Sequence, residues 1–153
     1  MRKAEKEVGL LSDMEDILRK SPVLRLAMID GDRPYLVPLC FGYRDMALFF
    51  HCAREGRKID ILRKNPAVWF EATAKAEILP GNPACRFSVS FESVMGEGVA
   101  EILDNEAERR LGLDCIMAHY GASPPFEYDE KSLALTCVVK VRIESMTGKR
   151  SKS

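Results

Sequence analysis

The feature that most constrains this chain is an alternation of apolar and polar residues with a period of two. The alternation runs through three segments, residues 23–30, 34–43 and 47–52. A period of two puts successive side chains on opposite faces of a strand, whereas a helix needs a period near 3.6. Turn-forming residues, Asp30-Gly31 and Arg44-Asp45, separate the segments. We therefore expect three consecutive antiparallel strands.

Three later segments also have strand character, residues 67–78, 87–103 and 135–143. The second is too long to stay flat, and Gly96 and Gly98 mark where we expect it to bulge or bend. In the third, alternate residues from Leu135 to Ile143 are expected to face a core. Six strands linked mostly by hairpins fit an α+β barrel better than a doubly wound parallel sheet.

Three helices are expected between the strands, over residues 12–20, 55–65 and 105–120. Ser12 with Glu15, and Asn105 with Glu108, have the spacing of a capping box, in which two side chains satisfy the free N–H groups of a first turn. Gly121 is a typical terminating residue for the third helix. Residues 123–131 are expected to form a loop.

Length and charge limit the classes of function. The 153 residues, 46% hydrophobic, suffice for one domain, which we take to be residues 1–153. Lys+Arg and Asp+Glu both number 23, so no overall field favours nucleic acid or an anionic membrane. No apolar run is long enough for a signal sequence or a membrane span, and we expect a cytoplasmic protein. The five scattered cysteines indicate free thiols rather than disulfides or a zinc site.

A candidate ligand-binding cluster is Gly56-Arg57-Lys58, at the start of the second expected helix. Free backbone N–H groups and two cations at a helix start suit a phosphate group. The alternative is an ordinary solvated basic face, since Arg63 and Lys64 continue the run. The patterns GxxxxGK and GxGxxG are both absent, which disfavours ATP and NAD folds.

The chain has two histidines, His51 and His119. His51 shares a strand face with Phe49, an apolar setting in which a histidine is more often packed than catalytic, although it lies close to the basic cluster. Cys115 and His119 are four apart on a helix, but two ligands without a third make a weak metal site, and we interpret this pair as structural.

Several stretches together resemble a known family, the nitroimidazole-resistance-protein-like branch of the pyridoxamine-phosphate-oxidase-like flavoproteins. The matching stretches are residues 37–43, 48–66, 93–101, 119–121 and 147–151. The resemblance spans most of the chain, and the order and spacing of the stretches are more specific than any single one. It favours the phosphate site over the solvated basic face.

The resemblance implies a six-stranded antiparallel split β-barrel with flanking helices, which forms a homodimer with one FMN in each of two interface clefts. Arg57 and Lys58 would hold the FMN phosphate, and His51 would face the substrate or relay a proton. The other residues implied to lie against the cofactor are Val37, Pro38, Leu39, Cys40, Cys52, Gly56 and Ser93. The implied activity is transfer of electrons from a reduced nicotinamide or flavin donor to a small, nitroaromatic-like acceptor.

The chain departs from true pyridoxamine-phosphate oxidases at three places. It has Gly56 where they have serine and Ser93 where they have glutamine, and their C-terminal substrate-phosphate motif is missing. Pyridoxamine phosphate is therefore not the expected substrate. Two alternatives remain open: a flavin-binding or redox-sensing module without turnover, and a haem-binding split barrel with His51 or His119 as axial ligand.

Overall fold

A computed structural model gives the fold of the chain and describes residues 4–151. Its strands are β1 (Glu7–Val8), β2 (Leu24–Asp30), β3 (Arg33–Leu39), β4 (Gly42–Arg44), β5 (Ala47–Ala53), β6 (Ala67–Leu79), β7 (Ser88–Leu103) and β8 (Thr136–Arg150). Its α-helices are α1 (Leu11–Lys20), α2 (Arg57–Lys64), α3 (Glu106–His119) and α4 (Glu130–Leu135), and short 3-10 helices cover Ala4–Lys6 and Ala84–Arg86. Within this part of the chain no helix is long and apolar enough to cross a membrane.

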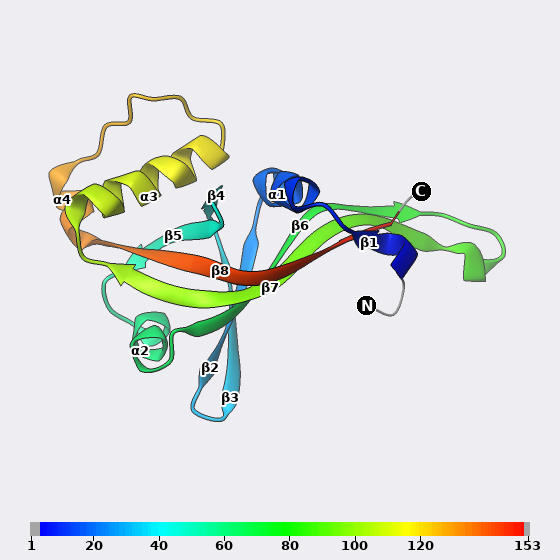
Figure 1. Cartoon of the computed structure of the whole chain (residues 1–153), viewed down its shortest axis with the longest axis horizontal. Helices are drawn as coiled ribbons and strands as arrows, with labels where there is room; N and C mark the ends of the chain where they lie inside the picture. The colour runs from blue at the N-terminus through cyan, green and yellow to red at the C-terminus, as the bar shows by residue number, and fades with distance from the viewer. Residues whose placement is uncertain (1–3, 152–153) are drawn as a thin grey trace.

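The strands form one antiparallel sheet in the order β3-β2-β6-β7-β8-β5-β4, with β1 beside β8 (Figure 1). β3 pairs only with β2 among the described strands, and residues Phe50–Ala53 of β5 pair only with β8. The sheet is therefore open, and we call these two unpaired edges the seam. The α+β class and the split-barrel architecture are confirmed, although the sheet has eight strands rather than six.

The expected run of three consecutively paired strands is wrong at its second connection. Residues 34–43 form two strands, and β4 pairs with β5 at the opposite end of the sheet order from β3. The cause is packing: Phe41 is 0% exposed inside the core, and a Cβ on Gly42 would collide with the backbone of Cys115 in α3. This close approach of α3 decides where the strand breaks.

Of the two predicted N-terminal helix caps, the structure has the one at Asn105 but not the one at Ser12. Asn105 caps α3 as expected, accepting hydrogen bonds from the N–H groups of Ala107 at 2.9 Å and Glu108 at 3.2 Å. Gly121 follows α3 with a φ of 85°, as a terminating residue requires. Ser12, in contrast, lies inside α1, which begins one residue earlier without a side-chain cap.

A helix replaces part of the expected loop at residues 123–131. Asp129 accepts a hydrogen bond from the backbone N–H of Ser132 at 2.9 Å and so caps α4. Leu135 ends this helix and is 74% exposed, so its predicted core position is wrong. The alternate residues from Cys137 to Ile143 do face the core, as expected.

The apolar residues form two cores on opposite faces of the sheet. The main core contains Phe50 and Val139 together with Ile17 of α1 and Ile59 of α2. A smaller core, with Phe49 and its neighbours on β8, lies beneath α3. Because β5 and β8 are covered on both faces, their apolar residues do not alternate cleanly with polar ones.

The long strand β7 carries the expected irregularity. Its pairing with β8 shifts register between Glu97 and Gly98, and a Cβ on Gly98 would collide with the carbonyl oxygen of Arg142. Beyond this point β6, β7 and β8 continue as an arm that extends from the body of the sheet (Figure 1).

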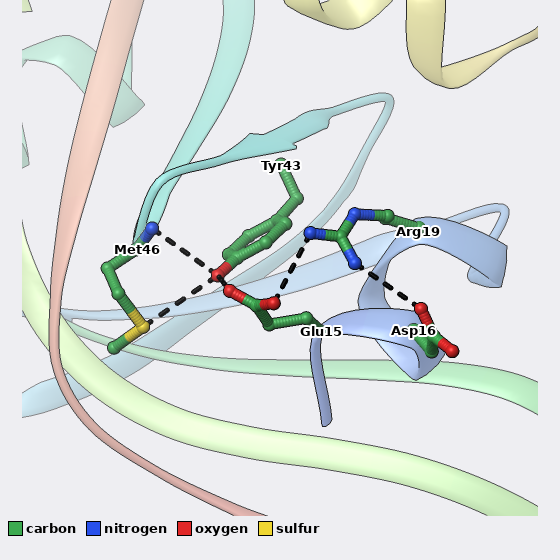
Figure 2. Close-up of polar contacts among 5 residues, drawn as sticks. All are labelled: Glu15, Asp16, Arg19, Tyr43 and Met46. Atoms are coloured by element: carbon green, nitrogen blue, oxygen red, sulfur yellow. Dashed lines mark hydrogen bonds and ion pairs between the residues drawn. The ribbon is translucent and has the colours of Figure 1, made fainter. Parts of the chain in front are cut away.

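A buried tyrosine joins α1 to β4 (Figure 2). The hydroxyl of Tyr43 donates a hydrogen bond to Glu15 Oε1 at 2.6 Å and accepts one from the backbone N–H of Met46 at 3.3 Å. Arg19 in turn pairs with Glu15 at 3.3 Å. Burial, with the Glu15 hydrogen bond, raises the pKa of Tyr43 to about 12, so this hydroxyl stays protonated as a donor.

We expect Tyr43→Phe to lower the free energy of unfolding by about 1–2 kcal/mol, because a largely buried hydrogen bond to a carboxylate is lost. Urea denaturation of the variant and the parent chain measures the difference. An unchanged midpoint would show that Glu15 and Met46 find water in place of the hydroxyl.

Candidate functional site

The N-terminus of α2 lies beside the seam. α2 follows β5 after three loop residues, and it contacts β2, whose hairpin with β3 lies next to it (Figure 1). Gly56 is the N-cap residue just before the helix; it has a φ of 123° and offers no side-chain cap. That backbone conformation is almost restricted to glycine. The first turn therefore presents uncapped N–H groups and the positive end of a helix dipole.

Both predicted phosphate-binding cations are in this first turn. Arg57 Nε lies 2.8 Å from Asp30 Oδ2, and its guanidinium group lies 4.6 Å from the ring centre of Tyr35 on β3. Lys58 Nζ lies 5.3 Å from the ring centre of Phe50 on β5. The two cations thus reach the two edges of the seam. The Arg57 side chain is 59% exposed, so its ion pair with Asp30 is weak and exchangeable.

The segment from Val37 to Cys40 lies at the end of β3. Val37 and Leu39 are half-buried against the main core, whereas Pro38 and Cys40 are exposed on the other face. Because β3 is an edge strand, its outward N–H and C=O groups have no strand partner among the described residues. The backbone is therefore available to a ligand, as the resemblance implies.

His51 and Cys52 lie on the other edge of the seam and point to opposite faces. His51 is exposed and is not packed in the core, whereas Phe49 on the same strand face is buried. Cys52 is half-buried and is the cross-strand partner of Cys137. Burial raises the pKa of Cys52 to about 11, so its thiol is protonated and a poor nucleophile near neutral pH.

Ser93 is not brought to this region within one chain. It pairs with Thr73 on β6 and Lys149 on β8. Ala27 of β2 pairs with Trp69 of β6. Thr73 lies four residues beyond Trp69 along β6, whereas Asp30 lies three residues beyond Ala27 along β2, toward the opposite end of the sheet. Seven residues of strand span about 23 Å. Within one chain Ser93 therefore lies far from the Arg57 end of the seam.

The C-terminus of α3 is attached to the end of β3. Tyr120 donates its hydroxyl hydrogen to the carbonyl of Pro22 at 2.9 Å and accepts the N–H of Phe41 at 3.2 Å. His119 Nε2 donates to the carbonyl of Ser21 at 2.8 Å. This bond gives His119 a structural role. Within residues 4–151 no group of three or more His, Cys, Asp or Glu gathers as a metal site would require.

The sequence did not indicate a hollow of about 820 Å³ between α1, β4, α3 and the loop before α4. Its lining includes Arg19, Arg44, Arg110 and Phe126. These residues come from four separated segments, and no motif unites them. Arg110 is paired there with Glu106 at 2.9 Å and Glu130 at 3.3 Å.

Solved structures of the same fold include one with substantial sequence identity. A candidate 5-nitroimidazole antibiotic resistance protein from Bacteroides thetaiotaomicron is 30% identical, with a TM-score of 0.83, over 94% of this chain and 85% of that one. An FAD- and haem-binding protein from Mycobacterium smegmatis is 20% identical, with a TM-score of 0.85, over 97% of this chain and 74% of that one. The second likeness shows the fold alone.

The flavocytochrome Anf3 from Azotobacter vinelandii also shares the fold, with a TM-score of 0.83 at 18% identity, over 100% of this chain and 72% of that one. No curated protein matches the chain. One family model, named pyridoxamine 5'-phosphate oxidase, matches residues 12–150. Because this match covers nearly the whole described chain, the chain belongs to the pyridoxamine 5'-phosphate oxidase family.

Proposed function

We propose that the chain is an FMN-dependent oxidoreductase that reduces a small aromatic acceptor such as a nitro compound. The observation that carries the proposal is the pair Arg57 and Lys58 at an uncapped helix start beside the open seam. The 5-nitroimidazole resistance assignment of the Bacteroides relative supports the acceptor class. Electrons would come from a reduced nicotinamide or flavin donor.

The residues at the seam fit an FMN phosphate. A dianionic group there would accept hydrogen bonds from Arg57, Lys58 and the first N–H groups of α2, and would displace the exposed Asp30 carboxylate from Arg57. The open edge of β3 at Val37, Pro38, Leu39 and Cys40 offers backbone groups to the rest of the molecule. Bound FMN would supply the electron-transfer chemistry, which no side chain of the protein provides.

The chain's own residues would bind, orient and exchange protons. Exposed His51 sits on the seam edge opposite β3 and can hydrogen-bond an acceptor oxygen or exchange a proton with it. Cys52, held protonated by burial, would pack against the cofactor rather than react. His119 is engaged with Ser21, which disfavours its use as a haem ligand.

Turnover of a nitroaromatic acceptor tests the proposal against a flavin-binding module without catalysis. We expect the purified protein to consume NADH or NADPH in proportion to the acceptor reduced. Flavin that is retained, but is reduced by neither nicotinamide nor a flavin reductase, would show a binding module instead.

We further propose a homodimer in which each site receives Ser93 from the partner. An exposed apolar patch on the outer face of the sheet supports this, since Leu36 is 60%, Trp69 54%, Ile29 48% and Met95 48% exposed. The pairing of β3, β2, β6 and β7 puts these four side chains on one face. Patches of this kind mark association surfaces.

We expect light scattering to give about twice 17.2 kDa for the parent chain and a single chain mass for Trp69→Glu, because a buried charge in an apolar interface is costly. The exposed Trp69 contributes little to the core, so circular dichroism should be unchanged. Flavin content should fall with the dimer, since each site would lose its partner's residues. A monomeric parent chain that still binds FMN would contradict the shared site.

A further inference from the structure

A second cluster of cations lines a small pocket between α2, the end of β7 and the start of α3. The pocket has a volume of about 110 Å³ and is lined by Arg54, Arg63, Arg109, Asp104 and Cys137, among others. The three arginines come from the loop after β5, from α2 and from α3. Arg57 is not among the lining residues, and its side chain pairs instead with Asp30 on the β2–β3 hairpin.

The side chain of Arg109, which lines this pocket, has hydrogen-bond donors without acceptors. Its Nε and Nη1 atoms are inaccessible to solvent and have no hydrogen-bond partner among the described residues. These two nitrogens carry three N–H donors. Buried donors on a charged group are strongly unfavourable when unpaired, and native structures nearly always satisfy them. The unpaired donors of Arg109 therefore indicate a ligand that supplies hydrogen-bond acceptors.

The other groups at the pocket leave it positively charged. Within residues 4–151 Arg54 has no ion pair, and Arg63 has only a long contact of 3.8 Å with the exposed Asp60. Asp104 is the one carboxylate among the lining residues. Burial raises the pKa of the Cys137 thiol, which is therefore neutral and supplies no counter-charge. Three guanidinium groups thus face one carboxylate.

The size of the pocket limits its occupant. A single water needs about 10–15 Å³ of such space, so there is room for a group several times larger. A planar guanidinium donates parallel hydrogen bonds that match the oxygens of phosphate, and convergence of several guanidinium groups is typical of phosphate recognition.

We propose that Arg54, Arg63 and Arg109 form a binding site for a phosphate group, separate from the flavin-phosphate site at Arg57 and Lys58. The ligand is inorganic phosphate or a small phosphate monoester. When it binds, its oxygens accept the free hydrogen bonds of Arg109 and offset the excess charge of the three arginines. A bound phosphate group would thereby bridge side chains of α2 and α3, which otherwise pack on opposite faces of the sheet.

Calorimetric titration of the flavin-loaded protein in phosphate-free buffer tests the site. Inorganic phosphate and glycerol 3-phosphate are titrated separately, and the tighter of the two identifies the source of the phosphate group. We expect saturable binding of one ion per chain, weakened about tenfold or more in Arg109→Met. Arg110→Met is the matched control, because Arg110 is the next residue of α3 and is already paired with Glu106 and Glu130; its affinity should stay within about twofold of the parent.

A thermal readout separates binding from folding. Arg109→Met should melt no lower than the parent in phosphate-free buffer, because buried unpaired donors are removed, but phosphate should no longer raise its melting temperature. If that variant fails to fold, Arg63→Met decides, because this side chain is 58% exposed and its replacement should leave the fold intact. Absence of saturable phosphate binding to the parent overturns the proposal. Binding that is lost in Arg57→Met but kept in Arg109→Met and Arg63→Met also overturns it, since the ion then occupies the flavin-phosphate site.

Discussion

Replacing Arg57 and Lys58 together with alanine should abolish flavin retention while the chain stays folded. Each cation would make charge-assisted hydrogen bonds to a phosphate dianion, contributing about 1.5–3 kcal/mol. Loss of both should therefore weaken flavin binding on the order of 10²-fold or more. Neither side chain is part of the main core: Arg57 contacts Asp30 and Tyr35, and Lys58 only covers the ring of the core residue Phe50. Flavin absorbance and circular dichroism, measured on the same sample, report binding and folding separately.

The control for this variant is the double replacement of Arg63 and Lys64 with alanine. It removes the same charge from the same helix, but at the C-terminal end of α2. We expect it to retain flavin, which separates a phosphate site from a merely basic helix face. Asp30→Asn should also retain flavin, because it frees Arg57 from its competing carboxylate. Full flavin occupancy in the Arg57 and Lys58 double variant would rule out the phosphate site.

His51→Ala should remain yellow but reduce a nitroaromatic acceptor far more slowly. His51 is exposed on the edge of the seam, so its removal leaves no cavity in either core. A group that hydrogen-bonds or protonates the acceptor contributes on the order of 10²- to 10⁴-fold in rate. We expect the loss in the rate of acceptor reduction, with little change in flavin content.

Rescue by another hydrogen-bonding side chain distinguishes a chemical role of His51 from a packing role. His51→Gln, whose side-chain amide can still donate a hydrogen bond to the acceptor, should recover part of the rate that His51→Ala loses. His119→Gln is the comparison, since the chain has two histidines and the second donates to the Ser21 carbonyl. This replacement should lower stability and leave the rate of acceptor reduction unchanged. A His51 variant that turns over at the parental rate would show that the residue has no catalytic part.

Locally encoded features were predictable from the sequence. The boundaries of α2 follow from Gly56 and Pro66, and the cap of α3 follows from Asn105, because each depends on residues next to it in the chain. Gly56 also explains a departure from the family pattern: its φ of 123° excludes serine without a change of backbone. The bulge at Gly98 was predictable because a strand of that length must bend.

Features that depend on distant contacts were not predictable. The break between β3 and β4 is set by the backbone of Cys115 against Gly42, which are far apart in the sequence. The ion pair between Arg57 and Asp30 likewise arises only when α2 packs beside the β2–β3 hairpin. The phosphate pocket around Arg109 joins residues from four elements and their connecting loops. Only the folded arrangement brings these groups together.

The most direct measurement is to denature the purified protein and identify the released cofactor by mass, with its amount per chain. We expect FMN, close to one molecule for each chain, and its loss from the Arg57 and Lys58 double variant. Release of haem, of FAD, or of no cofactor at all from the parent protein would contradict an FMN site at the seam.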